Sequence, residues 1–331
     1  MNFLFHASLF AGPTPIQLAA LTFTAVLGRH RIEVLPDARP GFEAWTDRLG
    51  SFRDALLEAE RASAHENAHH PSDVEISVEK REQSSWSKRR LTVDDAVELA
   101  HKPFRVLLEN GVSDRRFLLA MLRPEDREWL EKRVGLEWVE LEGCGGIQEL
   151  KKRVRWALDA QHVLRCAALF DGDAVEPPAA QPESEADFRA RLGPRSRRVL
   201  ELCEREPVDR AVGLLHHVLQ RRAIENYLPD RALESWVKVK SGAERRDRER
   251  KRKALRGCAH RFHYNTKDGY AGDRKRIPKP SWLPAAQNHP LEQGFGADIS
   301  SFFADVDPDD FDTSARNELE RFTTELLRRI R

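Results

Sequence analysis

The chain has 331 residues, of which 40% are hydrophobic and 33% charged, and its 55 basic side chains nearly balance its 54 acidic ones. This composition is typical of a folded globular protein and excludes a disordered chain or a polycation that binds nucleic acid through its overall field. The widely spaced Cys144, Cys166, Cys203 and Cys258 predict neither a zinc knuckle nor a disulfide framework. Because the apolar N-terminus lacks an early basic residue and is broken by Pro13, we expect a cytoplasmic protein without a membrane span.

The first hundred residues predict a small α+β domain without a constellation of catalytic residues. The expected elements are a strand at 2–10, a helix that Thr14 caps, Pro15 opens and Gly28 closes, a strand at 29–36, helical residues 40–66 with one glycine interruption, a strand at 73–82, and a helix at 91–102 that Thr92 caps. The histidines near residues 65–70 have no acidic or thiol partner beside them, so we interpret them as part of a solvated loop.

Strands and helices alternate from residue 103 onward, which predicts an α/β fold with a mostly parallel sheet flanked by helices. The expected elements are strands at 104–110, 135–142 and 163–171, a helix at 113–122 with Ser113 or Asp114 near its cap, and a helix at 145–160. A last amphipathic helix at 313–331 is expected to pack on the sheet as part of a C-terminal helical extension.

Carboxylates stand where two of these strands end, which is where parallel sheets bind ligands. Glu109 ends the first strand, and Asp171 and Asp173 follow the third. Residues two apart on an extended chain point to the same side, so we expect the two aspartates to converge across a bend at Gly172. Such carboxylates repel one another unless a divalent cation neutralises them, and Mg²⁺ or Mn²⁺ suits oxygen ligands. An ordinary acidic turn is the alternative interpretation.

Two of these stretches resemble the motifs of the Toprim domain, a catalytic module of topoisomerases, primases and a class of nucleases. The stretch RVLLENGVSDRRFL, with Glu109, Gly111 and Asp114, is similar to the first motif. The stretch ALFDGDAVEP, with Asp171 and Asp173, is similar to the second. The glycine turn CGGIQEL lies between them, as in this family, and we expect it to be a positive-φ turn before a helix.

Two later stretches resemble the motifs of the overcoming-lysogenization-defect (OLD) branch of Toprim nucleases. HVLQRRAIENYLPD is similar to the motif that follows the catalytic aspartates, which implies Glu225 as a further metal-site carboxylate and Asn226 as a supporting residue. FHYNTKDGYAGD is similar to the late lysine motif, which implies Lys267 near the site. The sequence departs from the family at Asn110 and Asp268, where glycine is more usual.

The resemblance covers residues 103 to 331 and implies three parts. These are an N-terminal domain of unknown role (1–100), a Toprim catalytic core (101–232) and a basic, helical part that completes the nuclease domain (233–331). The basic run at 244–256 contains Arg248, Arg250 and Arg252, which we expect to contact nucleic-acid phosphates. A solvated helix with internal ion pairs is the alternative interpretation of this run.

The resemblance implies a metal-dependent endonuclease in which Glu109, Asp171, Asp173 and Lys267 are catalytic, with Glu109 as ligand or general base. It also implies DNA ahead of tRNA or other RNA as substrate, and an ABC-type ATPase partner that controls a toxic effector in phage defence; a homo-oligomer stays open. The chain itself lacks the GxxxxGK[ST] phosphate loop. The alternatives are a non-catalytic docking or sensing subunit and, less favoured, an enzyme related to primases or topoisomerases.

Overall fold

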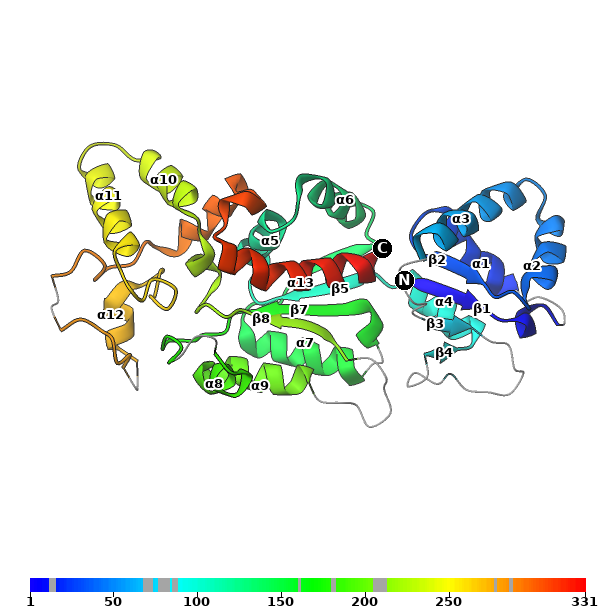
Figure 1. Ribbon diagram of the computed structural model, residues 1–331, viewed down its shortest axis with the longest axis horizontal. Coiled ribbons are helices and arrows are strands. Elements are labelled where there is room, and N and C mark those ends of the chain that lie inside the picture. The colour runs from blue at the N-terminus through cyan, green and yellow to red at the C-terminus, as the bar shows by residue number, and fades with distance from the viewer. Residues whose placement is uncertain are drawn as a thin grey trace.

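Two separate four-stranded parallel sheets organise the chain, and a helical lobe lies beyond the second sheet (Figure 1). The computed structural model describes residues 1–11, 16–67, 74–76, 84, 89–159, 162–179, 183–204, 213–276, 279–285 and 288–331. Thr14 and Pro15, His69 and His70, and most of the expected strand at 73–82 therefore lie outside the described residues.

The N-terminal unit is an α/β sheet, so the expectation of an α+β domain was wrong. All its described strand pairings are parallel, in the order β2-β1-β3-β4, whereas α+β domains usually contain antiparallel sheets. Its strands are β1 (Asn2–Phe5), β2 (Arg31–Val34), β3 (Val74–Ile76) and β4 (Arg90–Leu91). Its helices are α1 (Ile16–Val26), α2 (Arg39–Thr46), α3 (Phe52–Asn67) and α4 (Val93–His101).

Local signals account for several boundaries in this unit. Gly28 follows α1 at φ +71°, and Gly50 separates α2 from α3 at φ +60°, both in the left-handed region that favours glycine. The Thr92 hydroxyl accepts a hydrogen bond from the Asp95 amide at 3.3 Å, which confirms the expected cap of α4. The first strand is shorter than expected, because a 3-10 turn occupies Ala7–Phe10.

The central unit confirms the expected parallel sheet. Its strands are β5 (Phe104–Leu108), β6 (Val139–Gly143), β7 (Cys166–Phe170) and β8 (Leu215–Val218), in the order β6-β5-β7-β8 and parallel throughout. Its helices are α5 (Gly111–Ala120), α6 (Pro124–Gly135), α7 (Ile147–Asp159), α8 (Glu185–Arg191), α9 (Pro194–Cys203) and α13 (Thr313–Ile330). Sequence patterning missed α6, because Leu130 is its single buried residue and its apolar stripe is weak.

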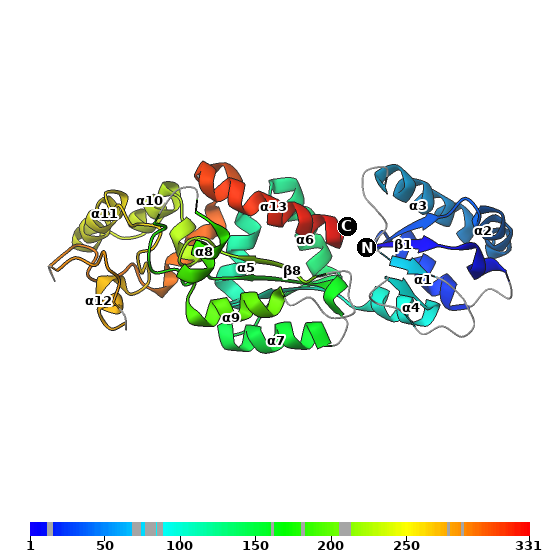
Figure 2. The same ribbon diagram turned by 60° about the horizontal axis from the view of Figure 1, so that its bottom comes forward.

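Helices cover both faces of the central sheet (Figures 1 and 2). On one face, Leu319 and Phe322 of α13 are buried in the same apolar cluster as Val106 of β5, so the last helix packs on the sheet as expected. On the other face, apolar residues of α7 and α9 pack against alternate residues of the same strands, including Leu107 and Ala168. This alternation follows from the two-residue period of a strand.

A lobe made of α10 (Asp230–Lys238), α11 (Gly242–Arg256) and α12 (Gly269–Arg274) lies beyond the carboxyl ends of the central strands (Figure 1). It has its own apolar cluster, which includes Trp236, Tyr264 and Phe295. All four cysteines are free thiols. None of the described helices combines the length and the apolar composition that crossing a bilayer requires.

Candidate active site

The strand-end residues Glu109 and Asp171 lie side by side at the carboxyl edge of the central sheet. Strands β5 and β7 are neighbours in parallel register, with Leu108 opposite Leu169, so the next residues of both strands emerge at the same edge. The Asp171 backbone hydrogen-bonds to the Glu109 carboxylate. Both residues are of intermediate exposure, and the Glu109 Oε2 atom is buried.

The pKa values show that several carboxylates act on one another at this edge. Burial raises the pKa of Glu109 to about 7, and the charges of Asp173 and Asp114 act in the same direction. Burial, followed by the charges of Glu109 and Glu225, raises the pKa of Asp171 well above its ordinary value. The structure therefore brings together the acidic residues that the sequence predicts as a group. Repulsion between their charges destabilises the folded protein.

Asp114 joins this group from the first turn of α5. The helix begins at Gly111, earlier than expected, and Asn110 precedes it without a side-chain cap. Instead, the buried Asp114 carboxylate accepts hydrogen bonds from the Asn110 amide at 2.8 Å and the Ser113 hydroxyl at 3.0 Å. Burial nevertheless raises the pKa of Asp114 to about 6.

Close packing of glycines shapes the same edge. A Cβ atom on Gly143 would lie 2.2 Å from the Gly111 Cα atom, so the end of β6 and the start of α5 approach too closely for a side chain on Gly143. Gly145 and Gly146 have φ angles of +81° and +116°, which confirms the expected positive-φ turn. The Gly146 amide also donates to the Glu109 carbonyl at 2.8 Å, which ties this turn to the site.

The Asp-Gly-Asp bend differs from the extended geometry that we expected. Asp173 has a φ of +51°, so the chain is not extended there and the two aspartates do not simply repeat along one face. The Asp173 amide donates to the Arg222 carbonyl at 2.9 Å. Gly172 is required by crowding, because a Cβ atom there would lie 2.3 Å from the Leu219 carbonyl oxygen. The Asp171 carboxylate accepts a hydrogen bond from the Ile224 amide at 3.0 Å.

Glu225 and Lys267 form an ion pair beside the strand-end carboxylates. The Lys267 Nζ atom lies 3.0 Å from Glu225 Oε1, with the glutamate side chain 1% and the lysine side chain 38% exposed. Burial lowers the pKa of Lys267, but the charges of Glu225 and then Asp171 outweigh it and leave that pKa raised. The lysine therefore stays positively charged next to the carboxylates while part of it faces solvent.

Asn226 holds the segments that carry these two residues together. Its amide nitrogen donates to the carbonyls of Arg261 and Tyr264, each at 3.0 Å, and its oxygen accepts from the Ala223 amide at 3.1 Å. It lies next to Glu225 in the 3-10 turn Ile224–Tyr227. Asn226 therefore links the segment of Glu225 to the segment that precedes Lys267.

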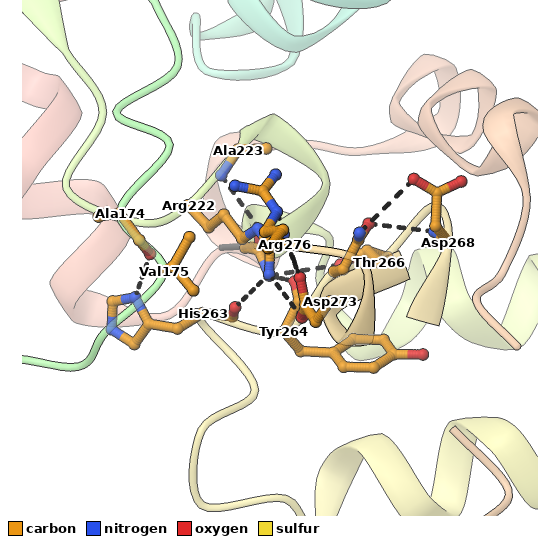
Figure 3. Close-up of polar contacts among 12 residues, drawn as sticks. Ala174, Val175, Arg222, Ala223, His263, Tyr264, Thr266, Asp268, Asp273 and Arg276 are labelled. Carbon is orange, nitrogen blue, oxygen red and sulfur yellow. Dashed lines mark hydrogen bonds and ion pairs between the residues drawn. The ribbon is translucent and has the colours of Figure 1, made fainter. Parts of the chain in front are cut away.

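A buried ion pair that the sequence analysis missed connects this edge to the helical lobe. Both oxygens of Asp273 accept from Arg222, at 2.8 and 2.6 Å, and the two side chains are 0% and 4% exposed. Figure 3 shows Arg222 and Arg276 approaching Asp273 together, with His263 bonded to the Ala174 carbonyl beside them. The paired arginines of QRRAIENY, directly before Glu225, were the available signal.

The chemistry of these residues fits a hard divalent cation. The donors are carboxylate oxygens, and Glu109 Oε2 is buried without a hydrogen-bond partner among the described residues. However, no three acidic, histidine or cysteine side chains in the described part of the chain stand close enough together to hold a metal ion. Holding Mg²⁺ or Mn²⁺ would thus require the carboxylates to turn toward one another.

Most of the basic run lies on α11 and is engaged in contacts within the lobe. Arg248 stacks on the Trp236 ring at 4.3 Å, and Arg252 pairs with Glu234 and Glu249; the two arginine side chains are 12% and 11% exposed. Arg250 is 67% exposed and lies 2.7 Å from an Asp247 carboxylate oxygen. The helix therefore has the internal ion pairs of the alternative interpretation, and Arg250 is the most accessible of the three expected contacts.

The site thus combines residues that sequence motifs indicate with residues that only the fold brings to them. Glu109, Asp114, Asp171, Glu225 and Lys267 interact with one another at one edge, whereas Arg222 and Asp273 join from positions that no motif marked. Comparison of the chain with family models, with curated proteins and with solved structures finds no match.

Proposed function

We propose that the protein is a divalent-metal-dependent nuclease that hydrolyses phosphodiester bonds. The observation that carries the proposal is a group of carboxylates with one lysine at the carboxyl edge of a parallel sheet. The group consists of Glu109, Asp114, Asp171, Asp173, Glu225 and Lys267. A divalent cation held by such carboxylates supplies Lewis-acid stabilisation and an activated water. The Toprim-like order of the motifs supports the same reaction class.

Within this proposal, the residues of the chain have separate tasks. Asp171, Asp173 and Glu225 are metal ligands, and Glu109 is a ligand or the general base. The half-exposed Lys267 offers a fixed positive charge to the negative charge that develops on the phosphate, an arrangement that needs no reorganisation during the reaction.

The partners are also proposals. By its resemblance to OLD-type nucleases, the chain acts on DNA ahead of RNA and is controlled by a separate ABC-type ATPase in phage defence. The chain has no phosphate loop of its own with which to hydrolyse ATP.

A non-catalytic docking subunit is the second candidate, and one observation favours it. The described carboxylates do not form a preassembled metal-binding group, and Asn110 and Asp268 depart from the family pattern. A topoisomerase is less favoured, because Tyr227, Tyr264 and Tyr270 are the only tyrosines and all are buried. A covalent nucleophile must reach the DNA strand, which these side chains do not.

The deciding experiment measures metal-dependent cleavage. The protein, alone and with a candidate ATPase, is incubated with plasmid, linear DNA and total tRNA in Mg²⁺, Mn²⁺ or EDTA. Glu109→Gln and Asp173→Asn are expected to reduce cleavage about 100-fold or more, because each removes a carboxylate from the centre. Glu128→Gln, an exposed carboxylate on α6, is the matched control and should cleave like the wild type.

The outcomes separate the candidates. Cleavage that disappears in EDTA and in both site variants supports the nuclease. Relaxed plasmid without strand ends would indicate a topoisomerase, and primer synthesis from nucleotides a primase. Binding to the ATPase without cleavage under any condition would establish the docking subunit instead.

A further inference from the structure

The candidate active site carries more negative than positive charge, which raises the question of how it receives an anionic substrate. Several carboxylates surround a single lysine at the sheet edge, and like charges at short range repel in a partly desolvated site. On α11, Arg248 and Arg252 are engaged inside the lobe. Attraction of a phosphodiester therefore requires cations that lie closer to the carboxylates than Arg248 and Arg252.

Arg276 is such a cation. It follows α12, its side chain is 41% exposed, and the charge of Asp173 acts on it through space. Its Nε atom lies 3.4 Å from Asp273 Oδ1. Within the part of the chain that the structure describes, the two terminal nitrogens of this guanidinium have no ion-pair partner. They form the fork that binds two oxygens of one phosphate.

The buried pair next to Arg276 fixes its position but compensates its charge only in part. Asp273 is fully buried and already accepts two hydrogen bonds from Arg222, so one carboxylate serves two guanidinium groups (Figure 3). Burial and the neighbouring Arg222 both lower the pKa of Arg276. An anion beside Arg276 would relieve this repulsion between the two arginines.

The basic residues around Arg276 are followed by two residues that contact the end of the Asp-Gly-Asp loop. Two further exposed cations flank Arg276, Lys275 before it and Lys279 after it. Just beyond Lys279, the Ser281 amide donates to the Glu176 carboxylate at 2.7 Å. The Trp282 indole then donates to the Val175 carbonyl at 3.0 Å. These contacts anchor the end of the basic segment to the residues directly after Asp173.

We propose that Lys275, Arg276 and Lys279 form the phosphate-binding rim of the active site, with Arg276 binding one backbone phosphate of a nucleic acid through its terminal nitrogens. Asp273 and Arg222 are positioning residues that hold Arg276 beside Asp173. This inference rests on the proposed nuclease function and assigns substrate binding to the rim rather than to α11. Lys267 meets the substrate from the Glu225 side, so the two cations bracket the carboxylates.

Fluorescence anisotropy with a labelled DNA duplex tests the rim independently of cleavage. Binding is measured in Ca²⁺ and in EDTA over a range of salt concentrations for the wild type, Arg276→Gln and Arg276→Lys. Arg276→Gln is expected to weaken binding about tenfold and to lower the salt slope by about one, because one phosphate contact is lost. Arg276→Lys keeps the positive charge but lacks the two terminal nitrogens that bind two phosphate oxygens. Its affinity for DNA should therefore lie between those of the wild type and Arg276→Gln.

Two control variants locate the effect. Arg155→Gln removes an exposed arginine on α7 and should bind like the wild type. A double variant, Arg245→Gln with Arg246→Gln, neutralises exposed arginines on α11. The rim proposal is overturned if this double variant weakens binding while Arg276→Gln does not. Thermal melting checks that each variant is folded.

The binding and cleavage measurements distinguish an error in the proposed phosphate-binding rim from an error in the proposed nuclease function. If the wild type cleaves DNA and Arg276→Gln keeps the same KM, the rim is wrong and the nuclease stands. If the wild type binds without cleaving and Arg276→Gln loses affinity, the rim stands and the nuclease does not. If the wild type neither binds nor cleaves DNA or RNA, both are wrong.

Discussion

The two parallel sheets share one strand order but differ in the residues that follow their strands. The first strand of each unit lies second in its sheet, in the orders β2-β1-β3-β4 and β6-β5-β7-β8. In the N-terminal unit, His6, Leu35 and Thr92 follow β1, β2 and β4. In the central unit, Glu109 and Asp171 follow β5 and β7. At the described position that corresponds to Glu109, the N-terminal unit therefore has His6, so the same topology carries an acidic residue there in one unit and not in the other.

This difference shows that the sheet is a scaffold and that its strand ends decide what the edge can do. The two units also differ in the burial of their ion pairs. The pair between Arg222 and Asp273 is almost completely buried next to the acidic edge. In the N-terminal unit, Arg53 pairs with Asp47 at 2.9 Å, and the two side chains are 45% and 63% exposed. The first pair is therefore shielded from water and the second is not.

The largest stability effect is expected from breaking the buried pair. Arg222→Ala removes both short hydrogen bonds to the buried Asp273 and leaves it only the 3.4 Å contact with Arg276, so it should cost about 3–5 kcal/mol in the free energy of unfolding. Arg53→Ala is the control change in the N-terminal unit and should cost about 1 kcal/mol or less, because water replaces the lost partner of the exposed Asp47. Urea unfolding followed by tryptophan fluorescence measures both, and equal losses would contradict the difference in burial.

The next effect is the pH dependence that Glu109 gives to the central unit. The folded pKa of Glu109 is about 7 and its unfolded pKa about 4.3, so the folded state binds the proton more tightly. The contribution of Glu109 to metal-free stability should therefore fall as the pH rises from about 4.5 to about 7, by up to about 3 kcal/mol. Glu109→Gln should flatten this profile and raise stability at pH 7.

Thermal melting in EDTA from pH 4.5 to pH 8 tests this dependence. Glu58→Gln, an exposed carboxylate on α3 of the N-terminal unit, should leave the profile unchanged. A wild-type profile that Glu109→Gln does not alter would rule out the raised pKa as its source.

A divalent cation should stabilise the central unit by a smaller amount. Because the ion binds the folded state, Mg²⁺ at about ten to thirty times its Kd adds about 1.4–2 kcal/mol. Asp171→Asn removes a proposed ligand and should reduce the rise in Tm that Mg²⁺ or Mn²⁺ produces. Equal metal-induced shifts in the wild type, Asp171→Asn and Glu58→Gln would remove Asp171 from the ligand set.

The smallest difference concerns the helix starts in the two units. Thr92 caps α4 through its side chain, so Thr92→Ala should cost about 1 kcal/mol. Asn110 precedes α5 but makes no side-chain cap, so Asn110→Ala should cost only a few tenths of a kcal/mol from this source. Chemical denaturation of the two variants should show this contrast, and a larger loss at Asn110 would contradict the uncapped geometry.

The sequence by itself determined the local features of this protein. Alternating strands and helices predicted the central parallel sheet, because the apolar period that distinguishes a strand from a helix is a local signal. Thr92 predicted the start of α4, because a cap joins residues close in the chain. The strand ends placed Glu109 and Asp171 at one edge, since parallel strands that are neighbours end on the same side. The spacing of apolar residues likewise predicted that α13 packs on the sheet.

Only the tertiary structure decided the remainder. It brought Glu225 to Lys267 and Arg222 to Asp273, pairs that are distant in the chain and so leave no periodic signal. It turned the backbone at Asp173 into the left-handed region through a hydrogen bond to another segment. It also drew Arg248 onto the Trp236 ring. Burial and electrostatic pairing between distant segments depend on how the elements pack, and local propensity carries no information about that packing.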